Sequence, residues 1–233
     1  MVGIEGKEAM TVSTFYPDAD PETTSVDGEV RHVYSSPAVA EDWAVLIAAI
    51  GNLARDATTT STIEIGSGGV SNKWDTLYRG ILLFDTSSLP DGSSISDARI
   101  KLYGQSKFDN LNITPNINIC AALPASNIGL VGTDFATLES TPFCDTPITY
   151  ANWTISGWNE FILNAAGIAA ISKTGITKLG VRNANYDVAA SAPTWSSVKG
   201  SGLVWYASEQ ASGKKPELII TTGVPRSRAY IID

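Results

Sequence analysis

Residues 78–104 carry the most regular hydrophobic pattern in the chain. An uninterrupted apolar run, Ile81–Phe84, follows Arg79-Gly80 and indicates a strand that is buried on both faces. After a turn containing Pro90 and the pair Asp91-Gly92, apolar and polar residues alternate over residues 98–103. This alternation predicts a second strand with one solvated face, and therefore an antiparallel sheet.

The same short-period pattern recurs along the chain and predicts nine or ten strands in all. Further strands are expected over residues 26–34, 60–68, 116–123, 177–185, 201–208 and 216–223, with two more within 148–164. A short helical turn is expected within residues 131–140. Residues 165–175 predict a helix that Asn164 begins and Gly175 ends. Residues 38–50 fit both helical and strand spacing, and we favour an extended or irregular segment there.

Many short strands separated by turn residues are typical of an all-β fold. We predict an antiparallel β-sandwich, jelly-roll-like, with one or two short helices. The expected organisation is an N-terminal arm at residues 1–13, a single sandwich domain at 14–223, and a C-terminal arm at 224–233.

Composition narrows the class of function. The chain has 233 residues, of which 43% are hydrophobic and 17% charged, and its net charge is 16 − 24 = −8. This acidity disfavours binding to nucleic acid, because phosphates would be repelled. The single histidine, His32, disfavours a Ser-His-Asp triad or a multi-histidine zinc site. A low-charge surface rich in Ser, Thr, Asn and Gly is typical of secreted or virion β-proteins.

Targeting signals and cysteines add two expectations. The N-terminus lacks a basic region followed by an apolar run, so we expect no signal peptide. No apolar run approaches the roughly 18–20 residues that span a membrane, so we expect no transmembrane segment. A phage component released by lysis would combine these features. Cys120 and Cys144 lack metal-ligand spacing, and buried free thiols are favoured over a disulfide bridge.

Three segments together carry a resemblance to a known family. Residues 79–104, residues 158–187 and the closing residues 214–223 resemble, in this order, the DNRLRE-type β-sandwich family, which is akin to some carbohydrate-binding modules. Residues 15–223 are also similar to hypothetical phage proteins from viral metagenomes. The resemblance implies a non-catalytic sandwich used for adhesion or assembly, and a structural calcium ion of the kind that such modules often carry.

Acidic residues near the N-terminus form the first candidate site. Asp18 and Asp20, with Glu22 and Asp27 nearby, offer hard oxygen ligands for calcium, although they lack the full ligand series of an EF-hand loop. The alternative is a solvated turn. We expect no other cofactor.

Aromatic side chains form the second candidate site, because sugar rings stack on the faces of Trp and Tyr. Trp74 and Trp195 lie in polar segments and Tyr78 follows Trp74 closely, so these three are the candidate carbohydrate-binding residues. The alternative for each is a packing anchor.

The remaining candidates have structural interpretations. Glycoside hydrolysis needs a pair of carboxyl groups, and candidates for such a pair are Asp75, Asp85, Glu160 and Asp187. Any chain with 24 acidic residues offers such candidates, so we assign no catalytic residue and expect no enzyme. Arg79 and Arg182 adjoin hydrophobic strands and are expected to tie loop carboxylates or carbonyls together rather than to bind an anion. We expect Arg79 and Asp85 to anchor the two ends of the first strand.

The function expected from these features is that of a non-enzymatic phage virion structural protein, a decoration or fibre-type module for particle assembly or surface adhesion. Its partners would be other virion proteins and further copies of itself, as a trimer or other symmetric oligomer. The alternative is a carbohydrate-binding module that recognises cell-surface polysaccharide. Neither nucleic acid nor membrane is expected as a partner.

Overall fold

The computed structural model describes residues 9–34, 39–210 and 213–224. Eleven strands within these residues pair in antiparallel fashion, and the helices are short. The predicted all-β sandwich is thus confirmed.

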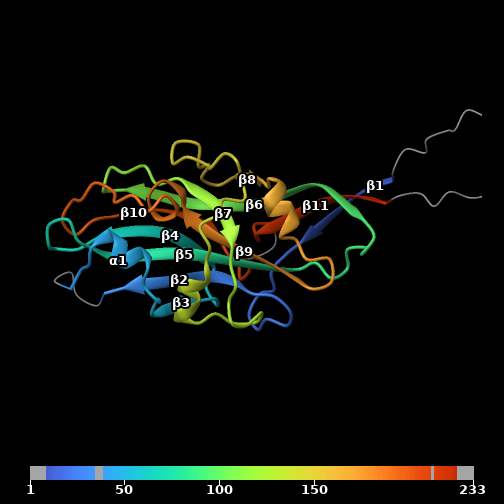
Figure 1. Cartoon of the computed structure of the whole chain (residues 1–233), viewed down its shortest axis with the longest axis horizontal. Helices are drawn as coiled ribbons and strands as arrows, with labels where there is room; N and C mark the ends of the chain where they lie inside the picture. Colours follow the sequence, from blue (N-terminus) through green and yellow to red (C-terminus); the bar gives the residue numbers. More distant parts are fainter. Residues whose placement is uncertain (1–8, 35–38, 211–212, 225–233) are drawn as a thin grey trace, which may run out of the picture.

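The strands form two layers that share the long strand β6 (Figure 1). The first layer contains β1 (Ala9–Phe15), β11 (Glu217–Val224), the first part of β6 (Ser94–Asp109) and β8 (Trp158–Ile162). The last part of β6 pairs with β10 (Gly200–Tyr206) and so enters the second layer. That layer continues through β4 (Thr60–Ser67), β5 (Trp74–Asp85), β2 (Asp27–Val33) and β3 (Leu53–Arg55), with β9 (Ile176–Asn183) and β7 (Ile117–Ala121) branching from β5.

Strand β5 explains why the second layer is so apolar. Its residues Leu82 and Phe84 pack in the core between the two layers, while Ile81 and Leu83 pack in a second core on the opposite face. All four side chains are buried, which confirms the burial on both faces predicted from the Ile81–Phe84 run. Within this strand Gly80 lies against the Trp205 ring, where an added Cβ would come within 2.8 Å of a ring carbon.

Short helices cover the second core. Helix α1 (Trp43–Ile47) buries Trp43 and Leu46, so the extended conformation favoured for residues 38–50 is wrong there; the amphipathic spacing of these two side chains prevails. The 3₁₀ helix η1 (Gly132–Thr137) is the predicted helical turn, and a π-helix, η2 (Ala184–Val188), follows β9.

Helix α2 (Ala165–Ala169) begins as predicted and ends early. The Asn164 Oδ1 atom accepts a hydrogen bond from the Gly167 amide at 3.0 Å and caps the helix. The helix ends well before Gly175, because the chain turns at Ala170 and bends again over residues 173–175 before it enters β9. Of the two strands predicted within residues 148–164, only β8 forms; the segment before it is held by loop contacts such as the bonds of Asn159 to Thr154.

The N-terminal boundary of the domain differs from the prediction. Residues 9–13, expected in an arm, belong to β1 and pair with β11 over a continuous register from Ala9 opposite Val224 to Phe15 opposite Leu218. Val224, expected to open the C-terminal arm, is the last residue of that pairing. Residues 1–8 and 225–233 of the two predicted arms lie outside the described residues.

Two further expectations concern cysteines and membranes. Cys120 and Cys144 are buried and unbonded to each other, as predicted. Within the part of the chain that the structure describes, no helix has the length and apolarity needed to cross a membrane.

Candidate functional site

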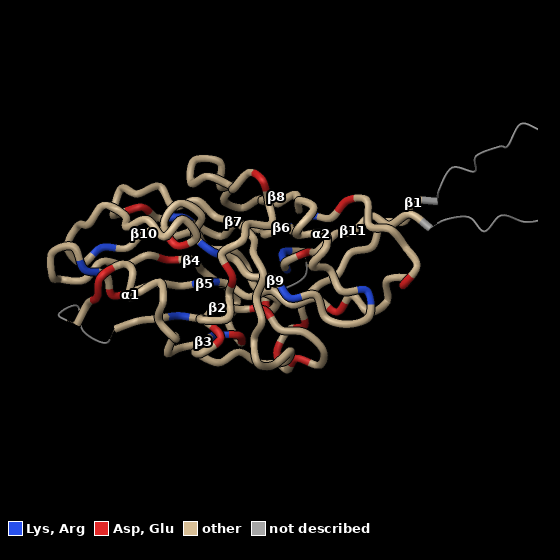
Figure 2. Tube along the Cα trace, viewed as in Figure 1, with Lys and Arg blue, Asp and Glu red and all other residues tan. Residues whose placement is uncertain are grey.

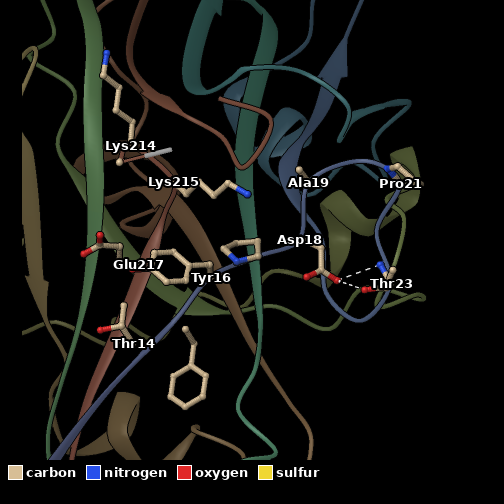
Figure 3. A pocket seen from close by; sticks show the side chains of 12 residues that line it. Thr14, Tyr16, Asp18, Ala19, Pro21, Thr23, Lys214, Lys215 and Glu217 are labelled. Carbon is tan, nitrogen blue, oxygen red and sulfur yellow. Dashed lines mark hydrogen bonds between the residues drawn. The ribbon is translucent and has the colours of Figure 1, made fainter. Parts of the chain in front are cut away.

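A pocket of about 720 Å³ lies where β1 ends and β11 begins (Figure 3). Because these strands are paired, the residues after Phe15 and those before Glu217 face each other across the pocket. Its wall is completed by the loop that runs from Tyr16 toward β2. The lining residues are Thr14, Phe15, Tyr16, Pro17, Asp18, Ala19, Pro21, Thr23, Gly213, Lys214, Lys215 and Glu217.

Asp18 organises the loop on one side of the pocket. Its Oδ2 atom accepts hydrogen bonds from the amides of Thr23 and Thr24 at 3.0 and 2.7 Å, and from both of their hydroxyls. Although burial alone would raise the pKa of Asp18, these bonds lower it to about 2, so the group is a carboxylate at neutral pH. Its Oδ1 atom receives no hydrogen bond from the described residues and remains an open acceptor.

Tyr16 and Lys215 supply the other functional groups of the pocket. Tyr16 is 48% exposed, so its ring is accessible to a ligand. Figure 3 shows Lys215 extending across the pocket toward Asp18 and Ala19. By contrast, Lys214 lies over the rings of Tyr206 and Tyr103, and Glu217 is paired with Lys101 at 3.2 Å. The pocket therefore combines an aromatic ring, an ammonium donor and a carboxylate acceptor.

Asp27, Glu22 and Glu209 form a cluster of carboxylates next to the loop that joins β1 to β2. Asp27 is fully buried, and both of its oxygens accept the Ser208 amide, at 3.2 and 3.3 Å. Burial raises the pKa of Asp27 to about 7, and the neighbouring carboxylates of Glu209 and Glu22 add to this rise against the opposing hydrogen bond from Ser208. Asp27 is therefore largely protonated below neutral pH.

The two residues predicted to bind calcium are not brought together for that purpose. Asp18 Oδ2 is occupied by the loop hydrogen bonds, and Asp20 is exposed, with its amide donating to Glu209 Oε1 at 3.3 Å. No group of three or more acidic, His or Cys residues within the described ranges is arranged to hold a metal ion. The role that the structure gives Asp18 is to shape the loop.

The contribution of Asp18 to the loop is directly testable. We expect Asp18→Ala to lower the free energy of unfolding by about 1–3 kcal/mol, since it leaves the Thr23 and Thr24 amides without their charged acceptor. Asp20→Ala is the matched control and should change stability by less than about 0.5 kcal/mol. Urea denaturation measures both; equal losses would show that Asp18 does not hold the loop.

The three predicted sugar-binding aromatics are not displayed together. Trp74 is only 5% exposed and packs edge-on against Trp43 in the second core, so its prediction as a sugar platform is wrong. The Arg31 guanidinium lies 4.0 Å from the centre of the Tyr78 ring and covers one of its faces. Trp195 packs against the second core and donates its Nε1–H to the Lys73 carbonyl at 3.1 Å. Each serves as the packing anchor that was its alternative.

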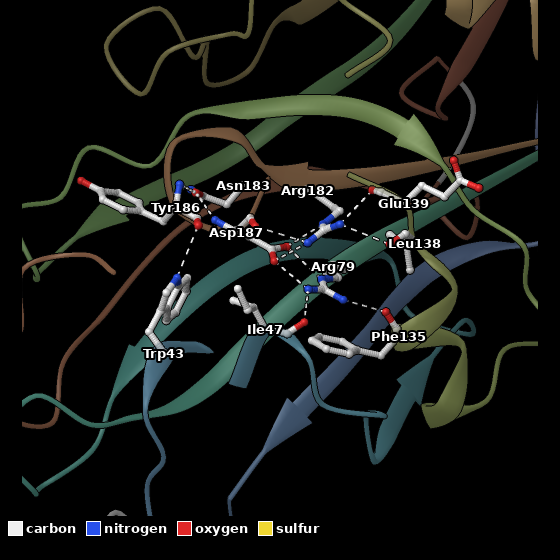
Figure 4. A network of polar contacts seen from close by, with 10 residues as sticks. All are labelled: Trp43, Ile47, Arg79, Phe135, Leu138, Glu139, Arg182, Asn183, Tyr186 and Asp187. Carbon is white, nitrogen blue, oxygen red and sulfur yellow. Dashed lines mark hydrogen bonds and ion pairs between the residues drawn. The ribbon is translucent and has the colours of Figure 1, made fainter. Parts of the chain in front are cut away.

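Arg79, Arg182 and Asp187 form a buried ionic network (Figure 4). Both guanidiniums bind the Asp187 carboxylate through paired bonds of 2.6 and 2.8 Å. Arg79 also donates to the carbonyls of Phe135 and Ile47, and Arg182 donates to those of Leu138 and Glu139. Although burial opposes ionisation, Arg79 and Arg182 hold the pKa of Asp187 below its usual value. The network clamps α1 and the η1 segment onto the sheet.

This network confirms the structural interpretation of both arginines. Asp85 is the last residue of β5, as expected, and its Oδ1 accepts the Ser87 amide at 3.0 Å. The carboxylate that pairs with Arg79 belongs to Asp187, which is 108 residues away in sequence. Such a long-range pair leaves no local signal in the sequence.

The pocket residues Tyr16 and Lys215 were absent from the predicted sites. Two signals pointed to them: an aromatic residue in a loop rich in Pro and Asp, and the only Lys-Lys pair of an acidic chain. Neither signal is specific alone, because the pairing of β1 with β11 is what brings them together.

Comparison of the chain with protein-family models and with curated protein sequences finds no match in either.

Proposed function

We propose that this chain is a non-enzymatic structural module of a bacteriophage virion, of the decoration or fibre type, that binds surface polysaccharide. The observation that carries the proposal is the pocket in which Tyr16, Lys215 and the Oδ1 atom of Asp18 converge. The resemblance to virion and carbohydrate-binding sandwiches supports the same class of function.

The chemistry of the pocket suits a neutral sugar. A pyranose ring can stack on the exposed Tyr16 ring, as sugars do on aromatic faces. Adjacent hydroxyls can accept a hydrogen bond from Lys215 and donate one to Asp18, whose pKa of about 2 makes it an acceptor only. The presence of both charges disfavours a purely anionic ligand, because Asp18 would repel it.

A binding role rather than turnover is supported by what the carboxylates do. Asp187 is enclosed between two guanidiniums, Asp85 binds the Ser87 amide, and Glu160 is paired with Arg99 at 2.7 Å. Asp18, the carboxylate of the pocket, has a lowered pKa and is therefore a poor general acid. Glycoside hydrolysis requires one carboxyl group that is protonated at working pH beside a second carboxylate. Asp27 has the raised pKa, but it is fully buried and is not among the residues that line the pocket.

Affinity electrophoresis through gels that contain neutral polysaccharides tests the proposal. We expect Tyr16→Ala and Lys215→Ala each to weaken the retardation about tenfold or more, since stacking on an aromatic face and a charged hydrogen bond are each worth about 1–3 kcal/mol. Lys199→Ala is the matched control, because it removes the same charge from an exposed lysine outside the pocket. Retardation that survives both pocket variants, or that is seen only with anionic polysaccharides, would contradict the proposed site.

The alternative is a carbohydrate-binding module that acts outside a virion, and the same pocket would serve it. Mass spectrometry of purified phage particles separates the two. A virion module is expected in fixed copy number relative to the major capsid protein. Its absence from particles, together with polysaccharide binding in the gel, would favour the free module.

A further inference from the structure

Strand β1 is an edge strand with an unusual composition. Within the described residues it pairs only with β11, so its other side presents unpaired backbone N–H and C=O groups. Its residues Met10–Phe15 contain no charge, no proline and no glycine. The pairing with β11 is continuous, and no bulge twists the edge away.

The other exposed edges of the sandwich are protected, which makes β1 stand out. Strand β3 is three residues long and ends in Arg55. Strand β8 carries Glu160, which is paired with Arg99. The free side of β7 is bridged by Ile148. Because natural sheets blunt their edges by shortness, charge or coverage, a long uncharged edge marks a site for strand addition.

The face of β1 that accompanies this edge is apolar as well. Met10 is 54% and Val12 is 64% exposed. Their neighbours on β11 are Gly223 and Thr221, so no charge adjoins Met10 or Val12 within the sheet. The carboxylate of Asp97, one strand further on at β6, is paired with Arg99 at 2.6 Å. Figure 2 shows the β1 region without charged residues, while charges are spread over the remainder of the body.

We propose that two copies of this chain pair through β1 in antiparallel fashion, and so form one continuous sheet across a two-fold axis. The strand is self-complementary for this arrangement: with Val12 opposite Val12 of the second copy, Met10 faces Thr14 and Thr11 faces Ser13. Each copy gains backbone hydrogen bonds at its open edge and covers Met10 and Val12. A two-fold interface of this kind is isologous and therefore closes at two copies.

The pair is expected to be weak, because one added strand covers less surface than a standard interface. Sedimentation analysis of the full chain from about 2 to about 400 µM should show a monomer–dimer equilibrium that follows mass action. Val12→Lys should raise the protein concentration at which half of the chains are dimeric at least tenfold, since it places like charges directly opposite each other. Ile162→Lys is the matched control: Ile162 is 62% exposed on the other edge strand, β8, and this variant should dimerise normally.

Cysteine cross-linking tests the register. Val12→Cys should form a disulfide-linked dimer when the protein is oxidised with oxidised glutathione, because directly opposed Cβ atoms lie within reach of a disulfide. Met10→Cys should form no such disulfide, because in the antiparallel register residue 10 lies opposite Thr14 of the second copy and far from residue 10 of that copy. The native Cys120 and Cys144 are buried and leave the readout clear.

A chain that stays monomeric over the whole range would overturn the proposal, as would a trimer or a dimer that Ile162→Lys disrupts and Val12→Lys does not. Self-pairing through β1 is separate from polysaccharide binding. Lys215→Ala should therefore leave the dimer intact, and each monomer of Val12→Lys should still bind polysaccharide through its own pocket and be retarded in the gel. Each proposal can thus fail while the other stands.

Discussion

Asp187→Asn is expected to lower the free energy of unfolding by about 3–5 kcal/mol, the largest loss for any single substitution considered for this protein. Among the residues that the structure describes, Asp187 is the only carboxylate that binds the guanidiniums of Arg79 and Arg182, and all three side chains are buried. Asparagine keeps one neutral oxygen acceptor, but its NH₂ group replaces the second oxygen, which both guanidiniums use, and the two buried cations lose their counter-charge. Their mutual repulsion and lost hydration then oppose folding.

Chemical denaturation at neutral pH measures this effect. Asp85→Asn is the matched control: it makes the same chemical change at the end of β5, the strand that carries Arg79. Among the described residues, the Asp85 carboxylate accepts a hydrogen bond from the Ser87 amide alone. We expect the control to cost about 1 kcal/mol or less. A loss for Asp187→Asn as small as that of the control would show that the network does not hold α1 and η1 to the sheet.

Asp27→Asn is expected to stabilise the protein at pH 8, by up to about 4 kcal/mol, and to flatten its pH dependence. The figure follows from the rise in the pKa of Asp27 from 3.8 to about 7, at roughly 1.4 kcal/mol for each tenfold change in proton affinity. An asparagine keeps an oxygen that can accept the Ser208 amide. Its NH₂ group can donate to Glu209 Oε2 or Glu22 Oε1, two buried oxygens that lack a partner among the described residues. It carries no charge that burial would penalise.

The direction of the pH dependence follows from proton linkage. Between pH 4 and 7 the folded state retains the proton on Asp27 while the unfolded state has lost it, so stability falls as pH rises through this window. Above about pH 7 both states are ionised and the contribution levels off. Glu22 and Glu209, whose pKa values are also raised by burial, reinforce the same trend.

Denaturation midpoints measured from pH 4 to pH 8 test this prediction. The wild-type chain should lose stability across the range relative to Asp27→Asn, and the two should converge near pH 4. Asp91→Asn, a change in an exposed turn, is the control and should follow the wild type. Parallel curves for wild type and Asp27→Asn would mean that Asp27 is ionised in the folded protein without cost.

The elements that depend on local pattern were predictable from the sequence. The Ile81–Phe84 run predicted a doubly buried strand, and the alternation over residues 98–103 predicted a strand with one solvated face, which β6 forms between β11 and β8. Asn164 was identified as the cap of α2. Helix α1 was missed because five residues carry little periodicity, and burial of Trp43 and Leu46 against the sheet outweighs local preference.

The class of fold follows from the sequence alone, because strand period and turn chemistry are local properties that act over a few residues. Which polar groups meet depends on how the strands pack together. Strand pairing placed Tyr16 and Lys215 in one pocket, sheet packing buried Trp74, and the return of the chain after β9 brought Asp187 to Arg79. The free edge of β1 was likewise decided by the order of strands, since an edge exists only when a sheet has been assembled. Contacts between residues far apart in sequence depend on the whole packed core, and that dependence is why pattern alone could not predict them.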